Sequence, residues 1–246
     1  MEASAVVQDP RRGDPPSPEA PIPAAAGSGM LRSSETEPSL QGFFEVNARC
    51  IEMLVSAARR ESKQSFTLVA ELRAPLIRLD PRMRERAAAH AFLLIDVEFG
   101  NADWWQAARA HSSQPLRGPL WKGVFPRESA VQLAVATLMF AWNSVRTDAA
   151  RMLVPLGMTR AVAQIIASLR FEEVDRIARK RSAYARPRWE DRPAVWRRLL
   201  AAAEANDPKA MGAFRLHAVQ LLAGDLLPAR ARDDAAPRPP RSSPSP

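Results

Sequence analysis

Cysteine is almost missing from this chain of 246 residues, in which Cys50 is the only one. A single cysteine excludes an internal disulfide and a cysteine-rich zinc site. The three histidines, His90, His111 and His217, lie far apart in the sequence and show no metal-binding spacing. The sequence therefore gives no sign of a metal or of another cofactor, and we expect neither.

Long apolar runs are missing as well. No window holds 18 consecutive apolar residues, so no segment is expected to span a membrane. The first residues, MEASAVVQDPRRGDPP, carry acids and prolines where a secretory signal needs a basic patch and an apolar run. We therefore expect a cytoplasmic protein with no membrane partner.

Glycine is absent between residues 43 and 99, and alanine, leucine and arginine are abundant there. These residues favour helix, and nearly every long segment of the chain has helical character. We expect an all-α fold: a multi-helix domain with a helix-turn-helix-like corner, disordered proline-rich termini and no strand.

The prolines mark the ends of the folded part. Seven of the 22 prolines fall within residues 1–40 and six within residues 228–246. Such segments lack the apolar surface that would offset the entropy of ordering, so both are predicted to be disordered tails. Between them we distinguish an N-terminal helical region with a Trp-rich loop, 41–125, from a helical domain, 126–227.

Apolar periodicity predicts the first helices. Residues 43–73 have apolar side chains at three- and four-residue steps, with a break near 62–65. The stripe begins with Phe43, Val46, Cys50, Met53, Leu54 and Ala57, and it suits either a core face or a dimer interface. Asp80 followed by Pro81 predicts a second helix. The apolar run 92–99 fits helix or strand, and we expect helix.

Residues 100–125 are rich in glycine and proline, so we expect a loop. The loop contains Trp104, Trp105 and Trp121, which either pack inside the protein or form an aromatic surface for a partner. A strong helix is predicted from Pro126 to about residue 146, with Trp142 on its buried stripe. Asp207 and Pro208 predict the start of the last helix.

Residues 147–182 predict three short helices. The first, 148–154, should end at Pro155 and Gly157, and Thr159 should cap the second. The third should cover 172–182, with Phe171 and Val174 facing inward. Short helices joined by turns of three or four residues are typical of helix-turn-helix proteins, although many proteins have such corners without binding DNA.

Positive charge is concentrated just beyond this corner. Between Arg176 and Arg198 there are nine basic and two acidic residues, a difference of +7 against +8 for the whole chain. A concentrated basic patch is the electrostatic footprint of a protein that binds phosphate, although a solvated arginine-rich face looks the same. The candidate DNA-binding residues are Arg176, Arg179, Lys180, Arg181, Arg186, Arg188 and Trp189.

The segment 138–191 resembles the D subunit of the bacterial flagellar master transcriptional activator. The alignment has no gaps, and its most specific part is Leu156-Gly157 followed by Ala163 and Leu169; it ends in a basic-aromatic tail around Arg188 and Trp189. The resemblance implies an all-α transcription activator that binds DNA, forms a homodimer and acts with a second, zinc-binding regulator subunit. Residues 41–125 and 199–246 lie outside it.

The function that the sequence favours is that of a DNA-binding transcriptional regulator or co-regulator that acts through the basic helical patch. The alternative is a helical protein–protein adaptor without DNA binding, such as a secretion-system accessory, which would use the Trp104–Trp121 region or the long first helix. An enzyme is not expected, because the chain has no Gly-rich phosphate loop, no HExxH and no nucleophile elbow.

Overall fold

The computed structural model describes residues 37–60, 66–111 and 123–233. Its elements run α1 (Glu37–Arg59), α2 (Thr67–Arg78), α3 (Pro81–Ala88), β1 (Ile95–Asp96), α4 (Ala102–Ala110), α5 (Arg127–Leu156), α6 (Arg160–Ala167), α7 (Phe171–Arg181), a 3₁₀ turn (Ser182–Tyr184), β2 (Arg186–Pro187), α8 (Pro193–Ala205) and α9 (Pro208–Asp233). The fold is all-α, as predicted, apart from the two-residue strands β1 and β2, which were not expected. Within the described residues, no helix is both long and apolar enough to cross a membrane.

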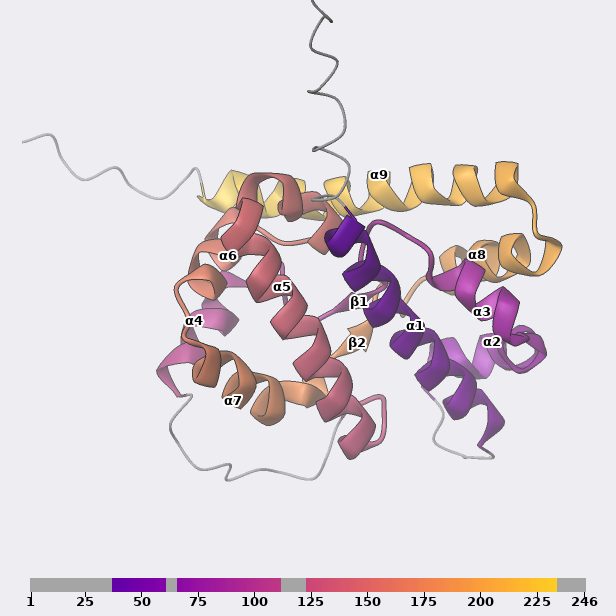
Figure 1. Ribbon diagram of the computed structural model, residues 1–246, viewed down its shortest axis with the longest axis horizontal. Coiled ribbons are helices and arrows are strands. Elements are labelled where there is room, and N and C mark those ends of the chain that lie inside the picture. The colour runs from indigo at the N-terminus through magenta and orange to yellow at the C-terminus, as the bar shows by residue number, and fades with distance from the viewer. Residues whose placement is uncertain (1–36, 61–65, 112–122, 234–246) are drawn as a thin grey trace, which may run out of the picture.

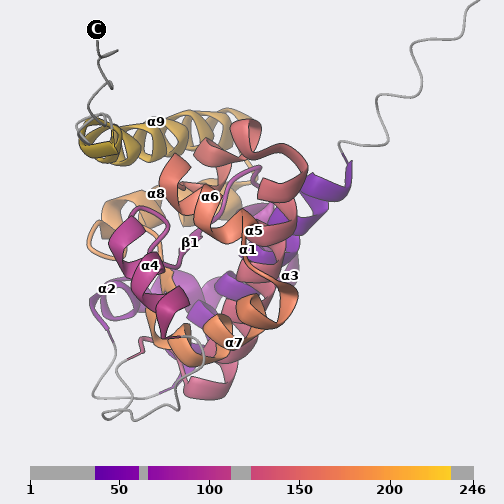
Figure 2. The same cartoon turned by 90° about the vertical axis from the view of Figure 1, so that its left-hand side faces the viewer.

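Helices α1 and α5 lie side by side at the centre of the molecule (Figure 1). Helices α2, α3 and α8 pack on one side of this pair, and α4, α6 and α7 pack on the other. Helix α9 runs across one edge of the molecule, as Figure 2 shows from the side, and contacts α8 and α5. One hydrophobic core therefore joins the N-terminal region to the helices from α5 onward.

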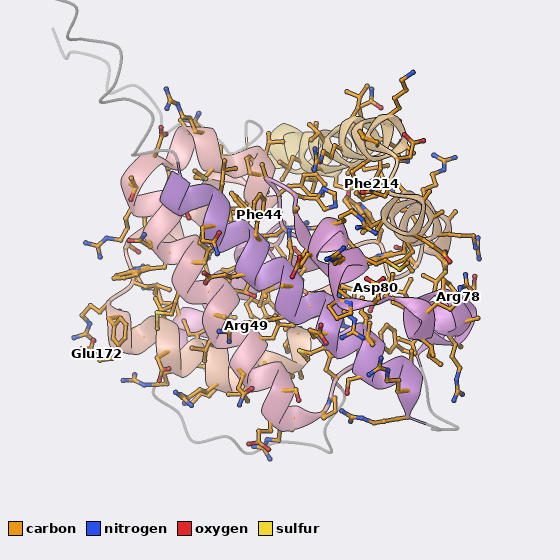
Figure 3. The ribbon with its side chains drawn as sticks, turned by 45° about the vertical axis from the view of Figure 1, so that its right-hand side comes forward. Phe44, Arg49, Arg78, Asp80, Glu172 and Phe214 are labelled. Atoms are coloured by element: carbon orange, nitrogen blue, oxygen red, sulfur yellow. The ribbon has the colours of Figure 1, made fainter. Side chains whose placement is uncertain are left out.

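The predicted apolar stripe of α1 is core and not a free surface. Phe43, Val46, Cys50 and Leu54 are buried, and Met53 is half-buried against them. Helix α3 begins as predicted, because the Asp80 carboxylate accepts a hydrogen bond from the Met83 backbone N–H at 2.7 Å. Asp80 marks this turn in Figure 3.

The helix expected at 92–99 was a wrong prediction. Residues 89–101 form an irregular, largely buried segment of bends and turns, in which Ile95–Asp96 (β1) pair antiparallel with β2, Ile95 opposite Pro187. The buried Asn47 side chain holds this segment: Nδ2 donates to the Phe92 carbonyl at 2.8 Å, and Oδ1 accepts from the Leu94 N–H at 2.8 Å. Because α1 supplies these partners, the segment does not need helical hydrogen bonds.

Other boundaries also differ from the predictions. The loop expected at 100–125 contains α4, in which Trp105 is buried and Trp104 half-buried; Trp121 lies outside the described residues. Helix α8 was not predicted. Helices α1 and α9 extend into the tails predicted at 1–40 and 228–246, whose remaining parts, 1–36 and 234–246, also lie outside the described residues.

The corner at 147–182 has the predicted three helices. The first is the end of α5, where Asp148 breaks the helical backbone and Gly157 ends the helix in the left-handed region, at φ 58°. Thr159 caps α6, since its hydroxyl accepts from the Val162 N–H at 3.3 Å. Three residues, 168–170, then turn the chain into α7.

Candidate nucleic-acid interface

Helix α7 is held in place by an apolar face that packs on the core and is stabilised by charged residues at both of its ends. Val174, Ile177 and Ala178 are buried, and the helix packs on α5. At the start of α7, the Arg170 N–H donates to the Glu173 carboxylate at 2.9 Å, which lowers the pKa of Glu173. Basic residues fill the last turn, where they complement the helix dipole. The opposite face of α7 is left to solvent.

The solvent face of α7 carries the candidate contact residues. An open hollow of about 410 Å³ runs along this face. Its lining consists of Phe171, Glu172, Asp175, Arg176, Arg179 and Lys180. The structure thus brings three of the predicted DNA-binding residues, Arg176, Arg179 and Lys180, onto a single helical face.

Ion pairing changes the charge that this face presents. Arg179 pairs with Asp175 at 2.8 Å, one turn back, which raises the pKa of Arg179. The Arg179 side chain is exposed and that of Asp175 is half-buried, and ion pairs near the surface contribute little to stability. A phosphate can therefore replace the carboxylate at small cost, and Arg179 remains available to bind one.

A basic residue of α5 joins the same surface. Arg127 lies with Glu128, Val131, Gln132 and Arg179 around a second open hollow of about 490 Å³. Arg127 was not among the predicted residues, because it precedes the basic cluster by 49 residues and only the packing of α5 on α7 brings it close. We call Arg127, Arg176, Arg179 and Lys180 the basic face.

Two further predicted residues, Arg181 and Arg186, lie outside the basic face. Arg181 is half-buried at the end of α7. Arg186 follows the 3₁₀ turn, and its exposed guanidinium pairs with Glu190 at 2.6 Å. Neither lines the two hollows.

Arg188 and Trp189 are buried, which corrects their assignment to a DNA-contacting surface. The Arg188 guanidinium pairs with Asp96 at 3.2 Å and donates to the Leu156 carbonyl. Burial lowers its pKa, whereas Asp96 and Asp225 act to raise it. The backbone N–H of Arg188 also donates to Leu94, so this residue ties β1 to the end of α5. It is a structural arginine.

An aromatic corner adjoins the start of α7. Trp142, predicted to be buried, is half-buried, and its indole N–H donates to the Leu169 carbonyl at 2.9 Å. Phe171, predicted to face inward, is 57% exposed and meets Trp142 edge-to-face at 6.3 Å between ring centroids. The Arg146 guanidinium lies over the Trp142 ring at 4.6 Å. Hydrophobic periodicity could not identify this corner, because it assigns aromatic residues to the core.

Groups suited to metal or thiol chemistry are not assembled in the described part of the chain. No cluster of three or more His, Cys, Asp or Glu side chains there could hold a metal ion. Cys50 is buried in α1, and burial raises the pKa of its thiol to about 12. The reactive thiolate is therefore strongly disfavoured.

Comparison with known proteins agrees with the resemblance drawn from the sequence. Residues 128–229 match the family model of the flagellar transcriptional activator (FlhD). The match includes 138–191 and extends from α5 into α9, which is less than half of the chain; α1 to α4 lie outside it. Comparisons with curated proteins and with solved structures return no match.

Proposed function

We propose that this protein is a DNA-binding regulator of transcription that contacts duplex DNA through the basic face. The observation that carries the proposal is the alignment of Arg176, Arg179 and Lys180 along one solvent face of α7, with Arg127 beside Arg179. The match of α5 to α9 with flagellar transcriptional activators supports a role in transcription. In this proposal the protein works in the cytoplasm and catalyses no reaction.

The mechanism is neutralisation of phosphates with release of counterions. Each phosphate neutralised on duplex DNA contributes about −0.9 to the slope of log K against log salt concentration. Four contacts from the basic face would give a slope of roughly −3.6. In the same proposal, α6, the turn at 168–170 and α7 act as a helix-turn-helix, with α7 entering the major groove.

The test measures binding of fluorescent duplex DNA by anisotropy at several salt concentrations. The variant combines Arg176→Glu, Arg179→Glu and Lys180→Glu. We expect it to lose most of the affinity and to have a slope shallower by roughly 2.7, because three phosphate contacts are gone.

The matched control combines Arg59→Glu, Arg82→Glu and Arg198→Glu, three exposed residues of α1, α3 and α8. It changes the net charge equally but away from α7, so it should keep a slope near that of the wild type. Equal losses in both variants would mean that the protein attracts DNA only through its overall charge.

A homodimer and a second regulator subunit belong to this proposal. The α1 stripe that could have served as a dimer interface is buried in the core of its own chain, so a dimer would have to use another surface. Light scattering on the purified chain, alone and with DNA, measures the number of copies.

A protein–protein adaptor is the second candidate, and the outer side of α9 favours it. Leu216 and Val219 are 63% and 41% exposed there, although they are large and apolar. Exposed apolar patches often mark protein contacts. If the wild-type chain binds no duplex DNA even at low salt, the adaptor becomes the preferred function.

A further inference from the structure

We propose that Phe171 reads DNA sequence by packing its ring against thymine 5-methyl groups in the major groove. The inference rests on the proposed function and deepens it, because the basic face supplies affinity without sequence information. It identifies the chemical feature that the protein selects, a methyl group at a base edge.

Phe171 occupies the place from which α7 can reach base edges. It is the first residue of the helix, 57% exposed, and it lines the same hollow as Arg176 and Arg179. Where a second helix enters the major groove, its N-terminal residues contact the bases. If the basic face binds phosphates, Phe171 therefore presents an exposed apolar ring on the surface that faces the groove.

The Phe171 ring is held before any DNA arrives. It packs edge-to-face on Trp142, which is fixed by its hydrogen bond to the Leu169 carbonyl. The Arg170–Glu173 capping interactions fix the start of the helix. A side chain ordered in advance loses little entropy on binding, so its apolar contact can add to affinity.

The surroundings of Phe171 fit a nucleic acid better than an apolar protein surface. The side chain of Arg170, the preceding residue, is 77% exposed, and Arg146 lies over the ring of Trp142, on which Phe171 packs. Both can meet the phosphates that flank a groove. Thymine is the one standard DNA base that carries a methyl group there, and phenylalanine is a known partner for it.

The acids at the start of α7 do not oppose this arrangement. Glu173 turns back to the helix N-terminus, and Asp175 is paired with Arg179. That leaves Glu172, which Figure 3 shows at the outer edge of the molecule. A carboxylate at that position can accept a hydrogen bond from a cytosine amino group.

The experiment replaces thymine by uracil, which removes only the methyl group. The full chain first selects its preferred duplexes from a random pool, and the selected duplex is then synthesised with thymine or with uracil. We expect the wild type to bind the uracil duplex about fourfold more weakly for each methyl group contacted, the effect of burying one such group.

Phe171→Ala should bind both duplexes equally, with the salt slope of the wild type, because phenylalanine neutralises no phosphate. Phe171→Leu, which keeps an apolar side chain, should retain part of the preference for thymine. Leu216→Ala, an exposed apolar residue of α9, is the matched control and should behave as the wild type.

Each contrary outcome is distinct. Equal binding of both duplexes by the wild type, or a thymine preference that survives in Phe171→Ala, overturns this inference alone. Unchanged binding of the thymine duplex by Phe171→Ala also overturns it. If the wild type binds no duplex at low salt, the proposed function fails and this inference fails with it.

Discussion

Among single residues, Arg188 was predicted to bind DNA because it lies in the basic stretch of the sequence. In the fold it is buried and stabilises the packing instead. Its guanidinium packs against Gly157, where an added Cβ would lie 2.5 Å from Arg188 Nη1. Gly157 also has φ 58°, in the left-handed region that favours glycine. The Leu156-Gly157 pair, the most specific part of the family resemblance, is thus explained by backbone geometry and by close packing.

Gly157→Ala should therefore destabilise the protein. A left-handed alanine costs about 1–2 kcal/mol, and displacing the buried Arg188 side chain adds about 1–3 kcal/mol. Urea denaturation gives the free energy of unfolding. The control is Gly212→Ala in α9, where an added Cβ meets nothing within 4 Å. That variant should gain about 0.5–1 kcal/mol, and a similar loss in both variants would contradict the prediction.

Among the elements, the irregular segment at 89–101 depends on a side chain from a helix that is far away in the sequence. Asn47 of α1 donates to the carbonyls of Ala88 and Phe92 and accepts from the N–H of Leu94, and it is fully buried. A segment without a helical or sheet ladder needs such partners for its buried backbone groups. The apolar run 92–99 has the composition of a helix or a strand, but hydrogen bonds from Asn47 stabilise an irregular path.

We expect Asn47→Ala to lower the free energy of unfolding by at least about 3 kcal/mol, because several buried backbone groups lose their partner at about 1–3 kcal/mol each. Hydrogen exchange at the Leu94 amide should accelerate more than exchange in α5. Arg49→Ala, on the exposed side of the same helix (Figure 3), should change stability by less than about 0.5 kcal/mol. Equal effects of the two variants would contradict this role of Asn47.

At the scale of the whole molecule, His90 lies where the N-terminal region meets α9. Its ring stacks on Phe92, contacts Phe214 and faces the Arg215 guanidinium, 3.4 Å from Nδ1. Phe214, labelled in Figure 3, is a buried residue of α9. Burial, followed by the charge of Arg215, lowers the pKa of His90 from 6.5 to about 3. Folding of the whole chain is thereby coupled to pH.

The direction of this coupling follows from the two pKa values. The folded protein keeps His90 neutral, whereas the unfolded chain binds a proton at the ordinary pKa of 6.5. Stability is therefore complete above about pH 6.5 and falls as the pH drops toward 3, by up to about 1.4 kcal/mol per pH unit. Urea titrations between pH 7 and pH 4 should show a shallower dependence for His90→Phe. His111→Gln, at the exposed end of α4, should keep the wild-type dependence; equal slopes for all three proteins would exclude His90 as the cause.

Much of the fold was predictable because it depends on neighbouring residues. Helix starts at Asp80, Thr159 and Asp207 follow from side chains that cap the next turn, and these were predicted correctly. The three helices of the corner follow from Pro155, Gly157 and local periodicity. Helix α8 was missed because its arginines led us to interpret the segment only as part of a charged patch, although Val195, Leu199 and Leu200 face the core.

The candidate site was predictable only in part. Charge density along the sequence located Arg176, Arg179 and Lys180 on a helix, since spacing within α7 puts them on one face. The same basic stretch of sequence also contains Arg188 and Trp189, which are buried in the fold. It does not contain Arg127 and Arg146, which the fold brings to the site. A count of charges contains no information about which side of a packed helix each one faces.

The sequence alone was enough to predict the helical class, the starts of α3, α5, α6, α7 and α9, and the place of the basic cluster, because these depend on hydrogen bonds and periodicity within a few residues. The packing of the helices sets which arginines are exposed, how α5 completes the basic face, and that Phe171 remains in solvent. Those features depend on contacts between segments far apart in the chain, where burial and ion pairing at each position are set by the neighbouring element. For that reason Arg179 and Arg188, nine residues apart and alike in sequence context, have opposite environments.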